Sequence, residues 1–254
     1  MSMLAPRIVV ALALLISLGF SSGALAKPKE NQSVTIKRQI EPRYPVWAYT
    51  HGVGQGYAKI AFYVDENGEA SEFLAIEYSY EAFADELMST ILKWDFVPAH
   101  REGRPVKSVC HAYWEFLPDR PIETNALFDT SKRMESGGSE PFRTVKFREE
   151  KELDERLGML GFPGLIQVKG TSPLKAGKKA VRARISFFVD QSGQVALPHV
   201  VDTTDPEVSE ELEAAFKKAT FSVPSYKGNG VIALLERTYD IPVVWIDEEQ
   251  PERL

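Results

Sequence analysis

The chain of 254 residues is long enough for one large domain or two small ones, and its 44% hydrophobic and 26% charged residues are ordinary for a globular protein. Its formal net charge of −6 gives little attraction for phosphate backbones, so we exclude nucleic acid as a partner. The single cysteine, Cys110, excludes an internal disulfide.

The N-terminal segment 1–26 has the pattern of an export signal. Arg7 precedes a run of apolar or small residues over 8–20, and an Ala-x-Ala site ends at Ala26. A spanning helix needs about 20 apolar residues, so the run is short for one. We therefore expect a cleaved signal peptide and a periplasmic protein. The alternative is an uncleaved anchor in the inner membrane.

The chain contains an internal repeat. Segment 56–116 aligns without a gap on 181–241 at a constant shift of 125 residues (183 − 58). In both copies one stretch has apolar residues at every second position, which predicts a strand with one face in a core. A turn that starts with Asp and ends with Gly follows each stretch. The matched strand positions are Ala58 and Ala183, Ile60 and Ile185, Phe62 and Phe187, and Val64 and Val189.

A second strand, a helix and a third strand are predicted to follow in each copy. Pro198 lies in the second strand of the later copy and cannot donate a ladder hydrogen bond, which indicates an edge position or a bulge. Apolar residues at helical spacing predict the helices, and Asp205 is expected to cap the later one. The expected elements are 69–78, 83–94 and 107–117 in the first copy, and 194–202, 208–219 and 232–246 in the second.

These elements predict the α+β class, with two tandem units that each have a small antiparallel three-stranded sheet and a helix packed on one face. We expect the other face of each sheet, and one edge, to stay open to water. A short helix is predicted over 148–160 from its leucine spacing. The expected domains are the signal peptide 1–26, unit 1 at 41–117, a linker at 118–147, and unit 2 with the short helix at 148–246.

Stretch 94–106 joins the first predicted helix to the third strand. We interpret Trp94 as the last apolar residue of the helix, Phe96 as turning back into the core, and Pro98 as preventing continuation. The string Trp-x-Phe-x-Pro-Ala followed by Gly-x-Pro-Val resembles the C-terminal domain of TonB proteins. The resemblance covers about 41–117, and about 165–246 looks like a degenerate second copy. Its structural positions are Tyr44, Pro45, Gly68, Trp94, Phe96, Pro98, Gly103 and Pro105.

The resemblance implies binding of a short receptor segment as an added strand, which requires an open sheet edge. A full energy transducer also needs an anchor and a long spacer, and segment 27–40 is short for that role. We therefore predict a periplasmic module that recognises an extended peptide of an envelope or outer-membrane protein. The alternative is an atypical TonB-type transducer held by an uncleaved anchor. The candidate edge strand is Ser108, Val109, Cys110, His111, Ala112, Tyr113, Trp114, Glu115 and Phe116.

We expect no enzyme, and no catalytic, metal or cofactor site or small-molecule substrate. None of the four histidines has metal-ligand spacing. Cys110 and His111 are neighbours on a strand and should face opposite sides, so a Cys-His nucleophile is disfavoured and an inert thiol is expected. Arg182 and Arg184, with lysines at 178–179, form a basic patch that serves solubility or an anionic partner. The sequence leaves a homodimer open.

Overall fold

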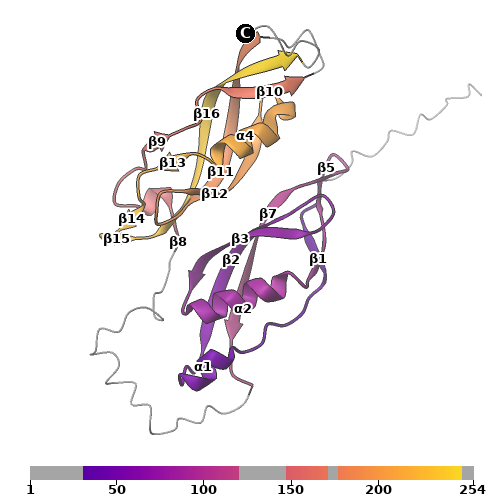
Figure 1. Cartoon of the computed structure of the whole chain (residues 1–254). Coiled ribbons are helices and arrows are strands. Elements are labelled where there is room, and N and C mark those ends of the chain that lie inside the picture. The colour runs from indigo at the N-terminus through magenta and orange to yellow at the C-terminus, as the bar shows by residue number, and fades with distance from the viewer. Residues whose placement is uncertain (1–30, 120–146, 171–176, 248–254) are drawn as a thin grey trace, which may run out of the picture.

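The computed structural model describes residues 31–119, 147–170 and 177–247. The predicted signal peptide and most of the predicted linker lie outside these ranges. The described chain is a mixed α+β structure that consists mostly of strands with a few short helices (Figure 1). None of these helices is both long enough and apolar enough to cross a membrane.

The first sheet has the strand order β3-β2-β7 and is antiparallel throughout. Its strands are β2 (Gly56–Val64), β3 (Ala70–Tyr78) and β7 (Ser108–Phe116), and α2 (Glu81–Ile91) packs on one face. The predicted core stripe is confirmed, because all four residues are at most 1% exposed and pack with α2. The stripe is Ala58, Ile60, Phe62 and Val64.

The second sheet contains the same three-strand arrangement in the order β12-β11-β16. The register is also equal: Gly56 pairs with Phe116, and Val181 pairs with Ile241, which is the same pair shifted by 125 (181 − 56 and 241 − 116). A 3-10 turn at Pro206–Val208 leads into α4, and Asp205 makes no side-chain capping hydrogen bond there. The elements are β11 (Gly177–Val189), β12 (Val195–Thr203), α4 (Ser209–Phe216) and β16 (Ile232–Asp247).

Two further strands make the second sheet larger than predicted. Both β8 (Phe147–Glu149) and β10 (Ile166–Gly170) pair with β16, and both run parallel to it. The expectation of a purely antiparallel three-stranded sheet is therefore wrong for this half of the chain. β10 precedes β11 in the chain but lies on the other side of β16, so that β16 is between the two strands (Figure 1). In this position β10 runs parallel to β16.

The outer edge strands β3 and β12 both carry a bulge. Glu72 in β3 has φ 49° and Leu197 in β12 has φ 50°, and the pairing register with the central strand shifts beside each of them. These two residues are again 125 positions apart. Pro198 follows the second bulge on an edge strand, so the prediction for it is confirmed.

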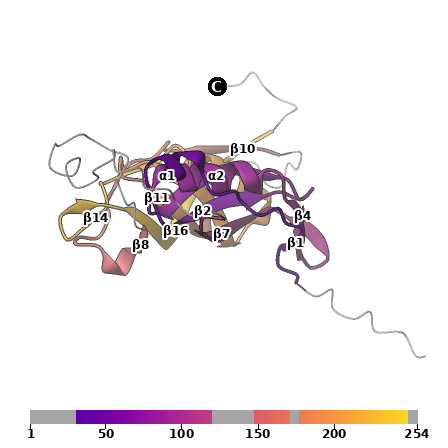
Figure 2. The same ribbon diagram turned by 90° about the horizontal axis from the view of Figure 1, so that it is seen from below.

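Short strand pairs close the ends of both halves. In Figure 2, β1 (Thr35–Arg38) and β4 (Asp95–Val97) lie together at one end of the first sheet, and they pair antiparallel. The first unit therefore begins before residue 41, the predicted boundary. The remaining short elements are α1 (Val46–Thr50), β5 (Ala99–Arg101), β6 (Arg104–Val106), β9 (Met159–Gly161), β13 (Thr220–Phe221), β14 (Ser225–Tyr226) and β15 (Asn229–Gly230).

The interpretation of stretch 94–106 needs correction. Helix α2 ends at Ile91, so Trp94 lies beyond it, and Pro98 separates two short strands rather than stopping a helix. Trp94 and Phe96 are each 8% exposed and belong to the first core, as expected for an aromatic helix exit.

The helix predicted over 148–160 is also wrong. That stretch contains the end of β8, one 3-10 turn at Glu150–Glu152, and the start of β9. Its leucines do not share one face, because Leu157 is 4% exposed in the second core whereas Leu160 is 73% exposed. The helical spacing was therefore coincidental.

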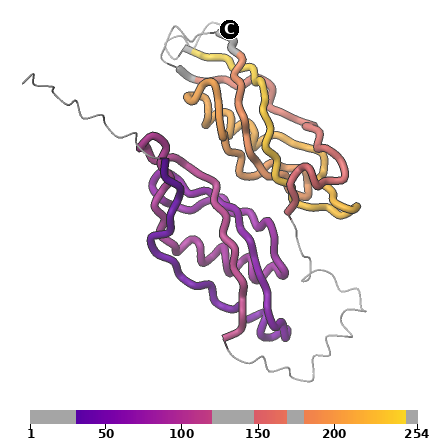
Figure 3. Tube along the Cα trace, turned by 180° about the vertical axis from the view of Figure 1, so that it is seen from behind, coloured from indigo at the N-terminus to yellow at the C-terminus, as the bar shows by residue number. Residues whose placement is uncertain are grey.

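The outer faces of the two sheets are only partly open to water, because one part of each packs on the other. Ala61 and Tyr63 of β2 are 0% and 4% exposed in a small apolar cluster with Phe188 of β11 and Leu197 of β12. Figure 3 shows the two halves of the chain meeting along one side. The expectation of a solvated outer face is therefore wrong where the two sheets pack together, whereas Arg182 and Arg184 on the outer face of β11 stay exposed.

Candidate functional site

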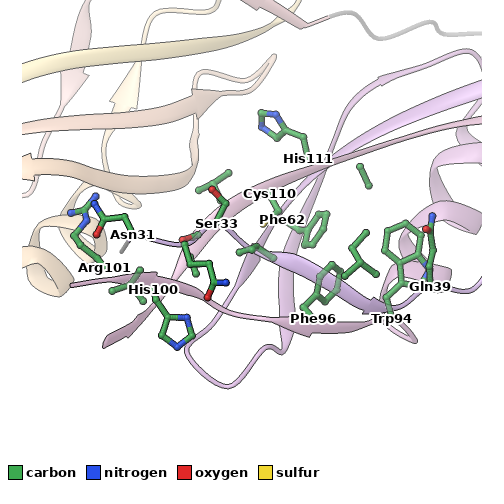
Figure 4. A pocket seen from close by; sticks show the side chains of 18 of the residues that line it. Asn31, Ser33, Gln39, Phe62, Trp94, Phe96, His100, Arg101, Cys110 and His111 are labelled. Carbon is green, nitrogen blue, oxygen red and sulfur yellow. The ribbon is translucent and has the colours of Figure 1, made fainter. Parts of the chain in front are cut away.

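The free edge of β7 borders a groove. Within the described ranges β7 pairs with β2 alone. Its residues Ser108–Tyr113 form one wall of a groove of about 660 Å³, and residues of segment 31–39 form the other (Figure 4). Six extended residues span about 20 Å, so the groove has the length of a short peptide strand.

The floor of this groove is apolar and largely aromatic. Phe62 and Phe96 lie with ring centroids 5.6 Å apart, and Trp94 lies beside Phe96 at 6.1 Å. The indole Nε1 of Trp94 donates to the carbonyl oxygen of Ile40 at 2.7 Å, so its polar atom is already satisfied. The floor therefore favours apolar side chains.

The rim is amphipathic and carries little charge. The rim includes two large hydrophobic side chains that are exposed to solvent: Ile36 is 47% exposed and Tyr113 is 54% exposed. Gln32 closes one end by exchanging two backbone hydrogen bonds with His100, at 2.8 and 2.7 Å. Apart from histidine, Arg101 is the one charged residue among the described groove residues. An uncharged, partly apolar segment fits such a rim best.

Cys110 and His111 point to opposite sides of β7, as predicted. The half-buried thiol of Cys110 faces the first core and the groove, and burial raises its pKa to about 11. At neutral pH it is therefore protonated and a poor nucleophile. The ring of His111 lies 5.9 Å from that of Phe188 in the second unit, and burial, followed by the charge of Lys59, lowers its pKa.

The predicted edge strand is only partly a groove wall. Trp114, Glu115 and Phe116 lie outside the groove, and Phe116 is 2% exposed in the first core. Sequence reasoning missed the opposite wall, segment 31–39. Its signal was the apolar alternation of Val34 and Ile36, which is typical of a short strand.

The positions that carry the TonB resemblance have structural roles. Tyr44 donates its hydroxyl hydrogen to the carbonyl oxygen of Val53 and lies edge-on to Phe83 at 5.6 Å. Gly103 has φ 77° in the turn between β5 and β6. The other positions lie at the start of α1 (Pro45), in the turn after β2 (Gly68), after β4 (Pro98) and in β6 (Pro105).

The corresponding place in the second sheet is filled. Arg237 of β16 lies where β7 has Ala112 (237 − 125). Its guanidinium ion-pairs with Glu150 and donates to the carbonyl oxygen of Leu157 at 2.6 Å, above the ring of Phe221 at 5.8 Å. These contacts hold chain 150–157 against the strand, so the two sheets differ at this position.

The basic patch predicted around Arg182 and Arg184 is neutralised across the strands. Arg182 Nε lies 2.8 Å from Asp240 Oδ1, and Arg184 Nη1 lies 2.7 Å from Glu236 Oε1. The interpretation of these two arginines as a site for an anionic partner is therefore corrected. Within the described ranges no group of three or more His, Cys, Asp or Glu side chains could hold a metal ion.

No family model matches the sequence, and no curated protein matches it either. A solved structure titled "Solution NMR structure of Pseudomonas aeruginosa TonB CTD" is 22% identical over 35% of this chain and 90% of that chain, with a TM-score of 0.30.

Proposed function

We propose that the chain is a TonB-like protein-binding module of the cell envelope, built from two copies of one unit, and that it binds an extended peptide of an envelope or outer-membrane protein. The peptide adds to the sheet beside β7. The module binds without catalysis and works in the periplasm.

The observation that carries this proposal is the groove along the edge of β7 that no other described strand pairs with. An edge strand presents unpaired backbone N–H and C=O groups, and an extended peptide satisfies them. Above the buried floor of Phe62, Trp94 and Phe96, the exposed side chains of Ile36 and Tyr113 offer apolar area to alternate side chains of that peptide. The motif of stretch 94–106, which resembles TonB C-terminal domains, supports the same mode of binding.

The proposal assigns peptide binding to the first unit. In the second unit Arg237, Glu150 and the carbonyl oxygen of Leu157 occupy the equivalent place. The same contrast suggests a variant, because Ala112→Arg would bring the arginine of the second unit into the groove of the first.

The experiment starts from the mature protein with a photo-crosslinker at position 113, exposed to outer-membrane extract. Mass spectrometry identifies the crosslinked segment, which is then synthesised as a peptide. We expect this peptide to bind the wild-type chain, to slow labelling of the sole thiol, Cys110, and to lose at least about tenfold in affinity for Ala112→Arg.

A matched control places the same arginine outside the groove. Leu92 is 62% exposed just after α2, and Leu92→Arg should bind like the wild type. Equal affinity of a folded Ala112→Arg variant and the wild type would exclude the β7 groove as the binding site. The same follows if the peptide leaves Cys110 labelling unchanged.

A further inference from the structure

β7 has a second set of contacts, on the side away from the first core. Val109 packs on the cluster that joins the two sheets, and His111 lies against Phe188. The partner of Val109 in the central strand is Tyr63, which is 4% exposed in the same cluster. The strand that borders the groove is therefore also a strand that the second unit touches.

A buried carboxylate of the second unit holds the start of β7. Glu213 of α4 is 8% exposed, and it forms an ion pair with Lys107, the residue before β7. The same carboxylate lies 3.2 Å from Nδ1 of His199 and accepts the backbone N–H of Val200 at 3.1 Å. Since a buried carboxylate with several partners has a defined position, Lys107 is fixed relative to the second sheet.

Two further polar contacts tie the same faces together. The hydroxyl of Tyr63 donates to the carbonyl oxygen of Pro198 at 2.5 Å. Lys217 of the second unit lies 2.6 Å from Glu72 of β3. The Tyr63 hydrogen bond is buried, so its loss leaves the carbonyl oxygen of Pro198 without a hydrogen-bond partner. The ion pair of Lys217 with Glu72 is exposed and contributes little to stability.

We propose that the second unit is a clamp for the edge strand. Glu213 of the second unit, and Tyr63 of β2 through its bond to Pro198, are positioning residues that hold β7 in the conformation a guest strand requires. An edge strand has ladder hydrogen bonds on one side only, and ordering it upon binding would cost affinity. The clamp removes that cost in advance. The inference rests on the proposed function only for the choice of β7 as the binding strand.

The test uses Cys110, the single cysteine of the chain, as a reporter on β7. The full mature protein is labelled with 4,4′-dithiodipyridine, without any peptide, and each rate is divided by that of the urea-unfolded chain. We expect labelling to be about tenfold faster in Glu213→Gln and about fivefold faster in Tyr63→Phe, because β7 opens more often. If Glu213→Gln does not fold, Tyr63→Phe decides alone.

The control is Glu236→Gln, which removes an exposed ion pair with Arg184 on the second sheet. It should label within about twofold of the wild type. The clamp is refuted if the folded test variants label at the wild-type rate, or if the control accelerates as much as they do. No guest is present, so this failure is separate from failure of the peptide-binding proposal.

A pH profile distinguishes positioning from general stability. Acidification should raise the normalised labelling rate of the wild type as Glu213 is protonated, and this rise should be clearly smaller in Glu213→Gln. An equal rise in both proteins would count against Glu213. The other charged or titratable residues that line this cavity are the same in both proteins, so a comparison of the two profiles isolates Glu213; they are Tyr63, Glu66, Glu72, Arg101, Lys107, His199, Glu210 and Lys217.

Discussion

Gly68 lies so close to the backbone of Phe96 that a Cβ atom on residue 68 would overlap the carbonyl oxygen of Phe96. The glycine also has φ 86°, which side chains rarely adopt. Gly193 has the same relation to Phe221, with φ 84°. In both halves the tight turn after the central strand is thus pressed against the chain that leaves the helix.

Replacement of Gly68 by alanine should therefore lower the free energy of unfolding by about 2–4 kcal/mol, because a positive φ and a backbone overlap add. Urea denaturation measures this loss. Gly54→Ala is the control, since no atom lies within 4 Å of a Cβ placed there. A Gly68→Ala protein as stable as Gly54→Ala would contradict the packing described for this turn.

The hydrogen bond from Trp94 to the carbonyl oxygen of Ile40 gives a second prediction. Trp94→Phe keeps the aromatic floor but leaves that acceptor unpaired, so we expect a loss of about 1–2 kcal/mol in unfolding free energy. Thermal and urea unfolding followed by circular dichroism would check it. Trp47→Phe provides a comparison, since Trp47 of α1 stacks on His51, the residue after the helix, outside the groove. A loss no larger than that of Trp47→Phe would show that the indole bond contributes nothing.

The Glu213 carboxyl should make the free energy of unfolding sensitive to acid. Burial alone would raise its pKa, but hydrogen bonds from His199, Lys107 and the Val200 N–H outweigh burial, so the pKa lies below its ordinary value. A carboxyl whose folded pKa is depressed stabilises the fold above its unfolded pKa, and this stabilisation is lost as pH falls through the folded value.

We therefore expect the unfolding free energy of the wild type to fall between about pH 5 and pH 3 more steeply than that of Glu213→Gln. At neutral pH the variant should be less stable by about 1–3 kcal/mol. Urea titrations across this range measure both quantities. Parallel curves for the two proteins would mean that Glu213 does not contribute to the acid dependence.

Arg237 should hold the chain 150–157 in place. Arg237→Gln loses the ion pair with Glu150 and the bond to Leu157, so we expect a cost of about 1–3 kcal/mol and faster amide exchange over 150–158. A double-mutant cycle with Glu150→Gln isolates the pair. Simple additivity of the two single losses would show that Arg237 and Glu150 are not coupled.

The sequence predicted the central strands well because their physical signal is local. Apolar residues at every second position must share one face of a strand, and Ile60 and Ile185 are both 0% exposed. The constant shift of 125 residues also matched the observed pairing register. Turn glycines and a proline on an edge strand are similarly local signals.

What the sequence missed depends on contacts between distant segments. Ala61 and Tyr63 alternate with the core stripe, so they read as solvent-facing, and only packing of the second sheet buries them. The outer wall of the groove was missed because β1 has just four residues, all exposed. Arg182 and Arg184 read as a patch because their cross-strand acids are more than 50 residues away.

The bulges at Glu72 and Leu197 have a consequence for the protein at high concentration. A bulge interrupts the regular row of donors and acceptors on β3 and β12, so neither strand is a good template for another copy. A sheet that binds a guest strand beside β7 therefore does not pair with a further strand at its opposite edge, β3. Growth of fibres through these two edges is therefore not expected, even at high protein concentration.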